Sequence, residues 1–212
     1  MQVAEIFHSI QGESTYAGLP CTFVRLTGCN LRCTWCDTEY AFYGGEKMTV
    51  QEVIEKVRAF GGRLVEVTGG EPLLQKEVYP LMRRLLQEGY RVLLETSGER
   101  PIDEVPREVV KIVDVKCPDS GEGDTFAIAN LERLAPHDQI KFVIGSRRDY
   151  EFARDFTRQH QLPQRVAAVI FSPVHGQLDL RQMAEWIIAD GLDVRFGYQL
   201  HKLIWGAEAR GV

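Results

Sequence analysis

The amino-acid sequence predicts an α/β fold in which short parallel strands alternate with amphipathic helices. Runs rich in Val, Ile, Leu and Phe recur along the whole chain with little polar alternation, which is typical of strands buried on both faces. Amphipathic segments separate these runs, and such strand–helix alternation indicates parallel strands joined by right-handed crossovers. About six or seven such units form either a doubly wound sheet or an incomplete β/α barrel.

The predicted elements follow one another in a regular order. The first helix begins with a capping box made by Thr49 and Glu52 and ends before Gly61 and Gly62. The second has Pro80 in its first turn, and a weaker pattern predicts a further helix over 124–134. The strands are expected over 22–27, 64–68, 92–96, 109–115, 139–144, 167–171 and 193–196. The first two helices are expected over 49–60 and 77–88, and two more over 148–160 and 180–189.

Size and composition predict one domain over 1–212. The chain has 212 residues, 44% of them hydrophobic and 26% charged, which is ordinary for a globular domain with a full core. A net charge of −5 argues against a surface built for nucleic acid. No apolar run approaches the ~20 residues that cross a bilayer, and the N-terminus lacks a secretion signal, so we expect a cytoplasmic protein without a membrane partner.

Polar and glycine-rich segments follow the predicted strands at the same end. They are found at 68–72, 95–98, 114–118 and 172–176, and a cysteine-rich loop follows the first strand. Because ligands gather at the carboxyl ends of parallel strands, we expect these segments to meet in a single active site.

The loop after the first strand contains Cys29, Cys33 and Cys36 in a CxxxCxxC pattern. Three cysteines leave one iron of a [4Fe–4S] cluster free to bind a small molecule, and an open iron beside S-adenosylmethionine is the basis of radical generation. The alternative is a structural zinc site completed by Cys21 or Cys117, although structural zinc usually takes two separated pairs of ligands. Disulfides fit less well, because the chain has five cysteines.

A second motif, Gly-Gly-Glu-Pro at 69–72, follows the next buried strand. Its two glycines let the backbone approach a ligand closely, and backbone carbonyls are acceptors that a methionyl amine needs. Alone it is most simply an ordinary turn. Together with the cysteine loop it resembles the signature of the radical S-adenosylmethionine superfamily.

Further motifs narrow this resemblance to the 7-carboxy-7-deazaguanine synthase family. The similar segments extend over essentially the whole chain: 9–13, 25–38, 67–72, 95–98, 114–118 and 199–206. The resemblance implies an incomplete, modified (β/α) barrel of about six parallel strands with a radical S-adenosylmethionine core, generally as a homodimer. It implies ring contraction of 6-carboxy-5,6,7,8-tetrahydropterin to 7-carboxy-7-deazaguanine with loss of ammonia, a step toward 7-deazapurines such as queuosine.

The resemblance also implies site residues. Cys29, Cys33 and Cys36 would bind the cluster, and Thr38 would reach a Mg²⁺ ion, a hard cation suited to oxygen ligands. Substrate would contact Ile10, Gln11, Gly12, Arg25, Thr68 and His201. S-adenosylmethionine would lie among Trp35, Cys36, Asp37, Gly70, Ser97, Lys116, Ser172, Pro173, Val174 and His175.

Among these, Arg25 has independent support, because a charge inside an apolar strand favours a buried role and a guanidinium can hold a carboxylate in a fork. Glu13 is expected to serve either substrate or loop structure, and Cys117 to be a packing residue. The partners expected are a pterin, an electron donor of the flavodoxin or ferredoxin type and no nucleic acid. Two other functions stay open, a glycyl-radical enzyme activase and a zinc-stabilised binding module.

Overall fold

The computed structural model describes residues 1–212 and contains one sheet of nine strands in the order β3-β1-β2-β4-β5-β6-β7-β8-β9. Its strands β2 to β9 run parallel to one another, whereas β1 is antiparallel to both β2 and β3. The strand bounds are β1 Gln2–Ile10, β2 Pro20–Leu26, β3 Glu46–Lys47, β4 Leu64–Gly69, β5 Arg91–Thr96, β6 Val110–Asp114, β7 Gln139–Ile144, β8 Ala168–Pro173 and β9 Arg195–Phe196.

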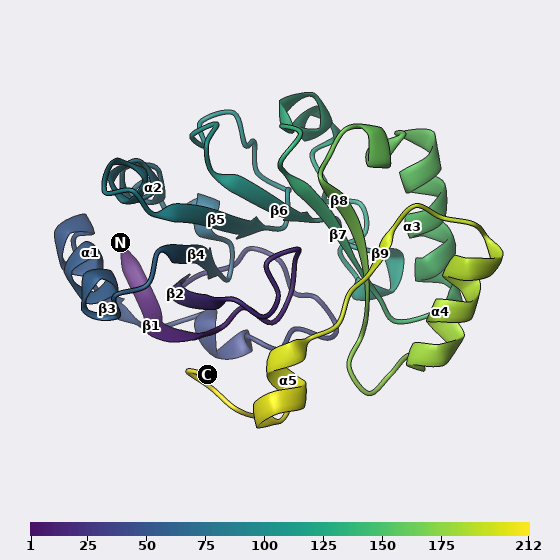
Figure 1. Ribbon diagram of the computed structural model, residues 1–212, viewed down its shortest axis with the longest axis horizontal. Coiled ribbons are helices and arrows are strands. Elements are labelled where there is room, and N and C mark those ends of the chain that lie inside the picture. Colours follow the sequence, from purple (N-terminus) through teal and green to yellow (C-terminus); the bar gives the residue numbers. More distant parts are fainter.

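The sheet is an incomplete barrel, so the predicted fold class is confirmed. It curves into an arc whose edge strands β3 and β9 are not paired with each other (Figure 1). The four longer helices lie on the outer side of this arc, which rules out the doubly wound alternative with helices on both faces. They are α1 Val50–Ala59, α2 Val78–Gln87, α3 Arg147–Gln159 and α4 Leu180–Ala189.

Local sequence signals account for most helix boundaries. Thr49 and Glu52 form the predicted capping box of α1, with both reciprocal hydrogen bonds present. Pro80 lies in the first turn of α2, where its missing N–H costs no intrahelical bond. A short helix that was not predicted, α5 Leu200–Trp205, follows β9 and lies at the open side of the arc (Figure 1).

The helix predicted over 124–134 is wrong. The chain forms only a 3-10 turn there, over Ile128–Arg133. The side chain of Asn130 explains this, because it donates hydrogen bonds to the carbonyl oxygens of Gly98 and Arg100 and accepts one from the backbone N–H of Ile102. An asparagine that satisfies a neighbouring loop in this way competes with helical hydrogen bonding.

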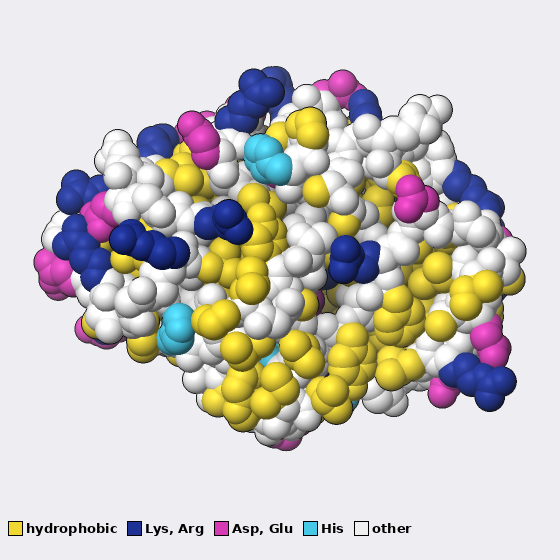
Figure 2. All heavy atoms as spheres, in the orientation of Figure 1, with side chains coloured by type: hydrophobic (Ala, Val, Ile, Leu, Met, Phe, Trp, Pro, Cys, Tyr) yellow, Lys and Arg dark blue, Asp and Glu magenta, His cyan; other side chains and the backbone are white.

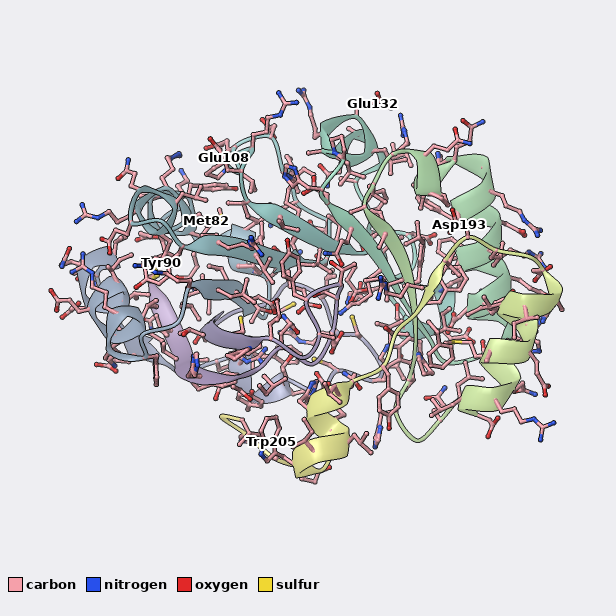
Figure 3. The ribbon with its side chains drawn as sticks, viewed as in Figure 1. Met82, Tyr90, Glu108, Glu132, Asp193 and Trp205 are labelled. Atoms are coloured by element: carbon pink, nitrogen blue, oxygen red, sulfur yellow. The ribbon has the colours of Figure 1, made fainter.

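The two faces of the sheet differ in chemistry. The outer face packs against the helices through continuous apolar cores, to which α2 contributes Met82, labelled in Figure 3. The inner face is apolar only near the amino ends of the strands, where Cys21, Leu64 and Val110 pack together. Toward the carboxyl ends it carries charged side chains, and the fold therefore surrounds a polar cavity. No helix is both long and apolar enough to span a bilayer.

Candidate active site

An outer cavity of about 310 Å³ opens at the carboxyl ends of the strands. It brings together segments that are far apart in the sequence, as expected for a site on this edge of a parallel sheet. The sequence-predicted residues that line it are Arg25, Cys29, Cys33, Trp35, Cys36, Asp37, Thr38, Thr68, Gly70, Ser97, Lys116, Ser172, Pro173, Val174, His175 and His201.

A smaller inner cavity of about 80 Å³ adjoins the outer one. Glu13, Arg25, Glu95 and His201 line both, so the two cavities share a wall. The remaining residues predicted to contact substrate line this inner cavity, namely Ile10, Gln11 and Gly12. The structure thus divides the predicted site into a cysteine-lined outer part and a polar inner part.

The cysteine loop, residues 28–38, has no regular secondary structure and is held by its backbone. Gly28 N–H donates to the Ala41 carbonyl oxygen at 2.8 Å, and Thr34 N–H donates to that of Ser120 at 2.9 Å. The thiols of Cys29, Cys33 and Cys36 form no disulfide. Burial raises the pKa of Cys29, and it raises that of Cys33 to about 11.

These three thiols suit an iron–sulfur cluster. They line one cavity, and the Leu31 N–H lies 3.4 Å from Cys29 Sγ, a backbone contact of the kind that tunes cluster sulfurs. Metal coordination deprotonates a thiol, so the raised pKa values make cluster binding depend on pH without preventing it.

The zinc alternative finds no support in this arrangement. Cys21 lies at the amino end of β2, on the inner face far from the loop, and Cys117 is buried in the apolar core with Val115 and Phe142. No three His, Cys, Asp or Glu side chains lie close enough to hold one metal ion. The packing environment agrees with the role expected for Cys117.

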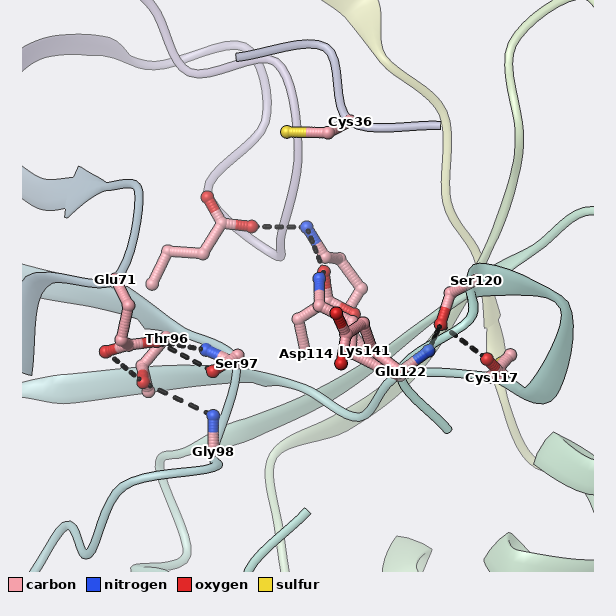
Figure 4. Close-up of polar contacts among 12 residues, drawn as sticks. Cys36, Glu71, Thr96, Ser97, Gly98, Asp114, Cys117, Ser120, Glu122 and Lys141 are labelled. Carbon is pink, nitrogen blue, oxygen red and sulfur yellow. Dashed lines mark hydrogen bonds and ion pairs between the residues drawn. The ribbon is translucent and has the colours of Figure 1, made fainter. Parts of the chain in front are cut away.

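The Gly-Gly-Glu-Pro segment contacts both the cysteine loop and the loop after β5. A Cβ atom on Gly70 would overlap the carbonyl oxygen of Gly28, so only glycine allows this contact with the cysteine loop. The buried Glu71 carboxylate accepts hydrogen bonds of 2.8 Å from Thr96 Oγ1 and from both the N–H and Oγ of Ser97 (Figure 4). Glu71 therefore fixes the β4 loop to the β5 loop.

Lys141 is the central cation of the inner site. Its Nζ lies 3.0 Å from Glu13 and 3.6 Å from Asp114, and it also bonds to Glu95. Figure 4 labels Lys141 and Asp114. Burial would lower the pKa of Lys141, but these three carboxylates raise it well above the usual value. Burial would likewise raise the pKa of Glu13, yet Lys141 and the Gln199 amide hold it below its usual range.

A second buried cation, Arg25, faces both cavities. Its Nε donates to Glu5 at 2.9 Å, and Tyr40 Oη donates to the same carboxylate at 2.7 Å. The two Nη atoms of Arg25 make no hydrogen bond within the protein, although the side chain is only 16% exposed. An anchored guanidinium with free terminal nitrogens is ready to bind a carboxylate.

The C-terminal segment completes the wall of the site. Gly12 has no room for a Cβ atom because His201 on α5 packs against it, and burial lowers the pKa of His201. Lys202 pairs with Asp37 at 2.8 Å, which connects α5 to the cysteine loop. Residues 207–212 also line the outer cavity.

Four residues of the site were missed by the sequence analysis, namely Glu5, Tyr40, Glu66 and Lys141, whereas Glu95 and Asp114 lie in the strand-end segments that it expected there. Most are charged residues within apolar strands, which is the signal that identified Arg25. If every charged residue within an apolar strand were taken as a site residue, Lys111 would be included as well. Its partner Asp138 lies away from both cavities. A charge in a strand therefore indicates burial, and only its place on the inner face of the sheet indicates the site, because Glu66 and Lys141 are each the third residue of a six-residue strand. Lys111 stands between Val110 and Ile112, which belong to the inner cluster, so it faces the other side of the sheet.

Comparisons with known proteins agree with this geometry. The chain matches the Radical SAM superfamily over residues 23–115. It is 57% identical to the 7-carboxy-7-deazaguanine synthase of Koribacter versatilis, over 100% of both chains. It is 45% identical to that of Chlorobaculum tepidum, over 100% of this chain and 97% of the other.

Structural similarity extends the comparison to a solved relative. The crystal structure of QueE from Escherichia coli superimposes with a TM-score of 0.78 and 26% sequence identity, over 94% of each chain. The chain shares sequence identity with these synthases over its full length, has the same fold and places three cysteines on one cavity. It therefore belongs to the 7-carboxy-7-deazaguanine synthase family, whose members are radical S-adenosylmethionine enzymes.

Proposed function

We propose that this enzyme converts 6-carboxy-5,6,7,8-tetrahydropterin to 7-carboxy-7-deazaguanine and ammonia, a step toward queuosine or another 7-deazapurine. The observation that carries the proposal is the adjacency of two different cavities. One is lined by the three cysteines, and the other is polar and bordered by Arg25. Substrate and product differ by one ammonia, so the conversion needs no net oxidant.

The cofactors would be a [4Fe–4S] cluster and S-adenosylmethionine, which when bound would supply the radical chemistry for hydrogen abstraction from the substrate. In our proposal Cys29, Cys33 and Cys36 hold the cluster. Asp114 Oδ1 is buried and has no hydrogen-bond partner, which leaves an acceptor in the outer cavity for a ligand. The residues around S-adenosylmethionine are Trp35, Cys36, Asp37, Gly70, Ser97, Lys116, Ser172, Pro173, Val174 and His175.

Substrate binding is assigned to the inner cavity and its border. The free Nη atoms of Arg25 hold the substrate carboxylate, while Glu5 and Tyr40 keep the guanidinium in place. Ile10, Gln11, Gly12, Thr68 and His201 contact the ring system. His201 has a lowered pKa, so it faces the ring as a neutral imidazole near pH 7.

A Mg²⁺ ion is proposed at Thr38, a residue that lines the outer cavity. Hard cations prefer oxygen ligands, and a single hydroxyl needs substrate oxygens to complete the shell. The ion would hold the substrate carboxylate in place during rearrangement.

We further infer that residues 1–212 act as one domain and that the enzyme pairs as a homodimer. One continuous sheet supports the first inference. Leu203, Ile204 and Trp205 support the second, because they form an exposed apolar patch on α5, at the bottom of Figure 2. The electron donor would be of the flavodoxin or ferredoxin type.

The direct test is anaerobic turnover. Cluster-reconstituted protein receives S-adenosylmethionine, a reductant, Mg²⁺ and 6-carboxytetrahydropterin, and 7-carboxy-7-deazaguanine is sought by mass spectrometry. Product without net loss of S-adenosylmethionine is the expected result. Release of 5′-deoxyadenosine without this product would retain the radical chemistry and overturn the substrate. Neither product nor cleavage from a protein with an intact cluster would overturn the enzyme assignment.

A further inference from the structure

Glu66 is a buried carboxyl group of the inner cavity that the function described above does not use. It lies on the inner face of β4, is only 4% exposed and lines the cavity. Its Oε2 accepts a hydrogen bond from Gln11 Nε2, whereas its Oε1 makes no hydrogen bond within the protein. One oxygen is thus held in place and the other is left for a ligand.

The surroundings of Glu66 set its protonation. In the strand register its neighbours are Phe23 on β2 and Leu93 on β5, so apolar side chains flank it on both sides. No Lys or Arg forms an ion pair with it, because Lys141 is bonded to Glu13 and Glu95. Burial raises the pKa of Glu66 well above the usual value, and the nearby carboxylates of Glu95 and Glu13 raise it further.

The adjoining Gln11 amide is oriented by the same contacts. Its Oε1 accepts a hydrogen bond from the backbone N–H of Glu13 at 2.8 Å, which fixes Nε2 on the side of Glu66. An amide nitrogen carries two hydrogens, and only one is used by Glu66. A buried carboxyl group without a cation partner and an amide N–H therefore stand side by side at the inner cavity.

The following inference depends on the substrate proposed above. We propose that Glu66 and Gln11 form a pair of hydrogen-bond donors that binds the ring carbonyl oxygen of the pterin. Glu66 is then a specificity-determining residue. A pteridine with an amino group in place of this carbonyl would present N–H donors to the donors of Glu66 and Gln11. A site that donates hydrogen bonds to a carbonyl oxygen strongly rejects a ligand that has a donor there, because the buried donors are left unpaired.

Equilibrium binding to cluster-loaded protein without reductant tests the pair separately from turnover. The probes are the unreactive oxidised compounds 6-carboxypterin and 2,4-diaminopteridine-6-carboxylate. The fluorescence of each ligand measures its binding. Wild type is expected to prefer 6-carboxypterin by at least about 10-fold. Glu66→Gln keeps a donor and should bind 6-carboxypterin within about threefold of wild type, whereas Glu66→Leu should lose about 10-fold and the preference with it. Glu108→Gln changes an exposed carboxyl group, labelled in Figure 3, and is the control.

Raising the pH gives a second measurement that does not depend on the folding of Glu66→Leu. Wild type should lose affinity as Glu66 ionises, and Glu66→Gln should lose less, although Cys21, Glu13, Arg25, Glu95, Lys141 and His201 also face this region. Unchanged preference in Glu66→Leu, or identical pH profiles for wild type and Glu66→Gln, would overturn the proposal. If wild type fails to form 7-carboxy-7-deazaguanine, the substrate assignment fails instead, whatever these binding results show.

Discussion

The outer and inner cavities differ in how their functional groups are held. In the outer cavity the three cysteine thiols have few contacts, and the loop that carries them has no regular structure. In the inner cavity Lys141, Arg25, Glu13 and Glu95 are bound to one another or to neighbouring strands. The charged groups of the inner part are therefore held by contacts within the protein, whereas the thiols of the outer part are free to bind a ligand. Variants in the two cavities should fail in different ways.

The largest effect is expected at the cysteine loop. Cys29→Ser, Cys33→Ser or Cys36→Ser removes one cluster ligand, so bound iron and the absorbance near ~400 nm should fall sharply, with turnover lowered at least about 1000-fold. The fold should remain, because none of these thiols belongs to an apolar core. Iron content, visible absorbance and 5′-deoxyadenosine release measure this.

Cys117→Ala is the matched control, since this thiol is buried in the core and absent from the outer cavity. It should keep the iron and lose only packing, about 1 kcal/mol. Loss of the cluster in this variant, or its retention after Cys33→Ser, would contradict the division between the cavities.

The second effect concerns stability. Lys141→Met leaves Glu13, Glu95 and Asp114 without their shared cation, and removing one partner of a buried ion pair costs about 3–5 kcal/mol. The free energy of unfolding in urea measures the loss. The control is Arg181→Met, whose exposed pair with Glu185 should contribute less than about 1 kcal/mol. Equal losses in the two variants would show that the inner charges are not arranged as described.

The third effect is on substrate affinity. Arg25→Lys keeps the charge but loses the fork, so KM for the pterin should rise about 10- to 100-fold while affinity for S-adenosylmethionine changes less than about twofold. Arg63→Lys, an exposed substitution, should change neither quantity. A parallel loss of both affinities in Arg25→Lys would mean that Arg25 supports the whole site and not the substrate alone.

These differences also explain what could be predicted from the sequence. The outer site was predictable because its residues stand in contiguous motifs, such as the cysteine loop and the segment around Gly70. The parallel strands were predictable because burial on both faces gives continuous apolar runs. The roles assigned to individual residues stay predictions.

The inner site was less visible, because its members come from different strands and meet only after folding. Glu66 and Lys141 are single charged residues within apolar runs, and Lys111 has the same appearance with a purely structural partner. The helix expected over 124–134 failed for a related reason, since Asn130 bonds to the distant residues Gly98, Arg100 and Ile102. Sequence patterns report local structure well and long-range polar pairing poorly.

The smallest effect expected is on the pH dependence of stability. The pKa of Glu66 is raised in the folded protein, so Glu66 binds a proton at pH values where the unfolded chain has released it. Its contribution to stability is complete below the ordinary pKa of 4.5 and is lost as the pH rises through the folded value. Glu66→Gln cannot ionise and should lose less stability between acidic and alkaline pH. Thermal unfolding at several pH values should show the melting temperatures diverging by at least about 2 °C, the effect of about 1 kcal/mol in a domain of this size. Parallel curves would mean that Glu66 ionises in the folded protein as it does in the unfolded chain, and the inner cavity would then hold a further negative charge beside Glu13 and Glu95.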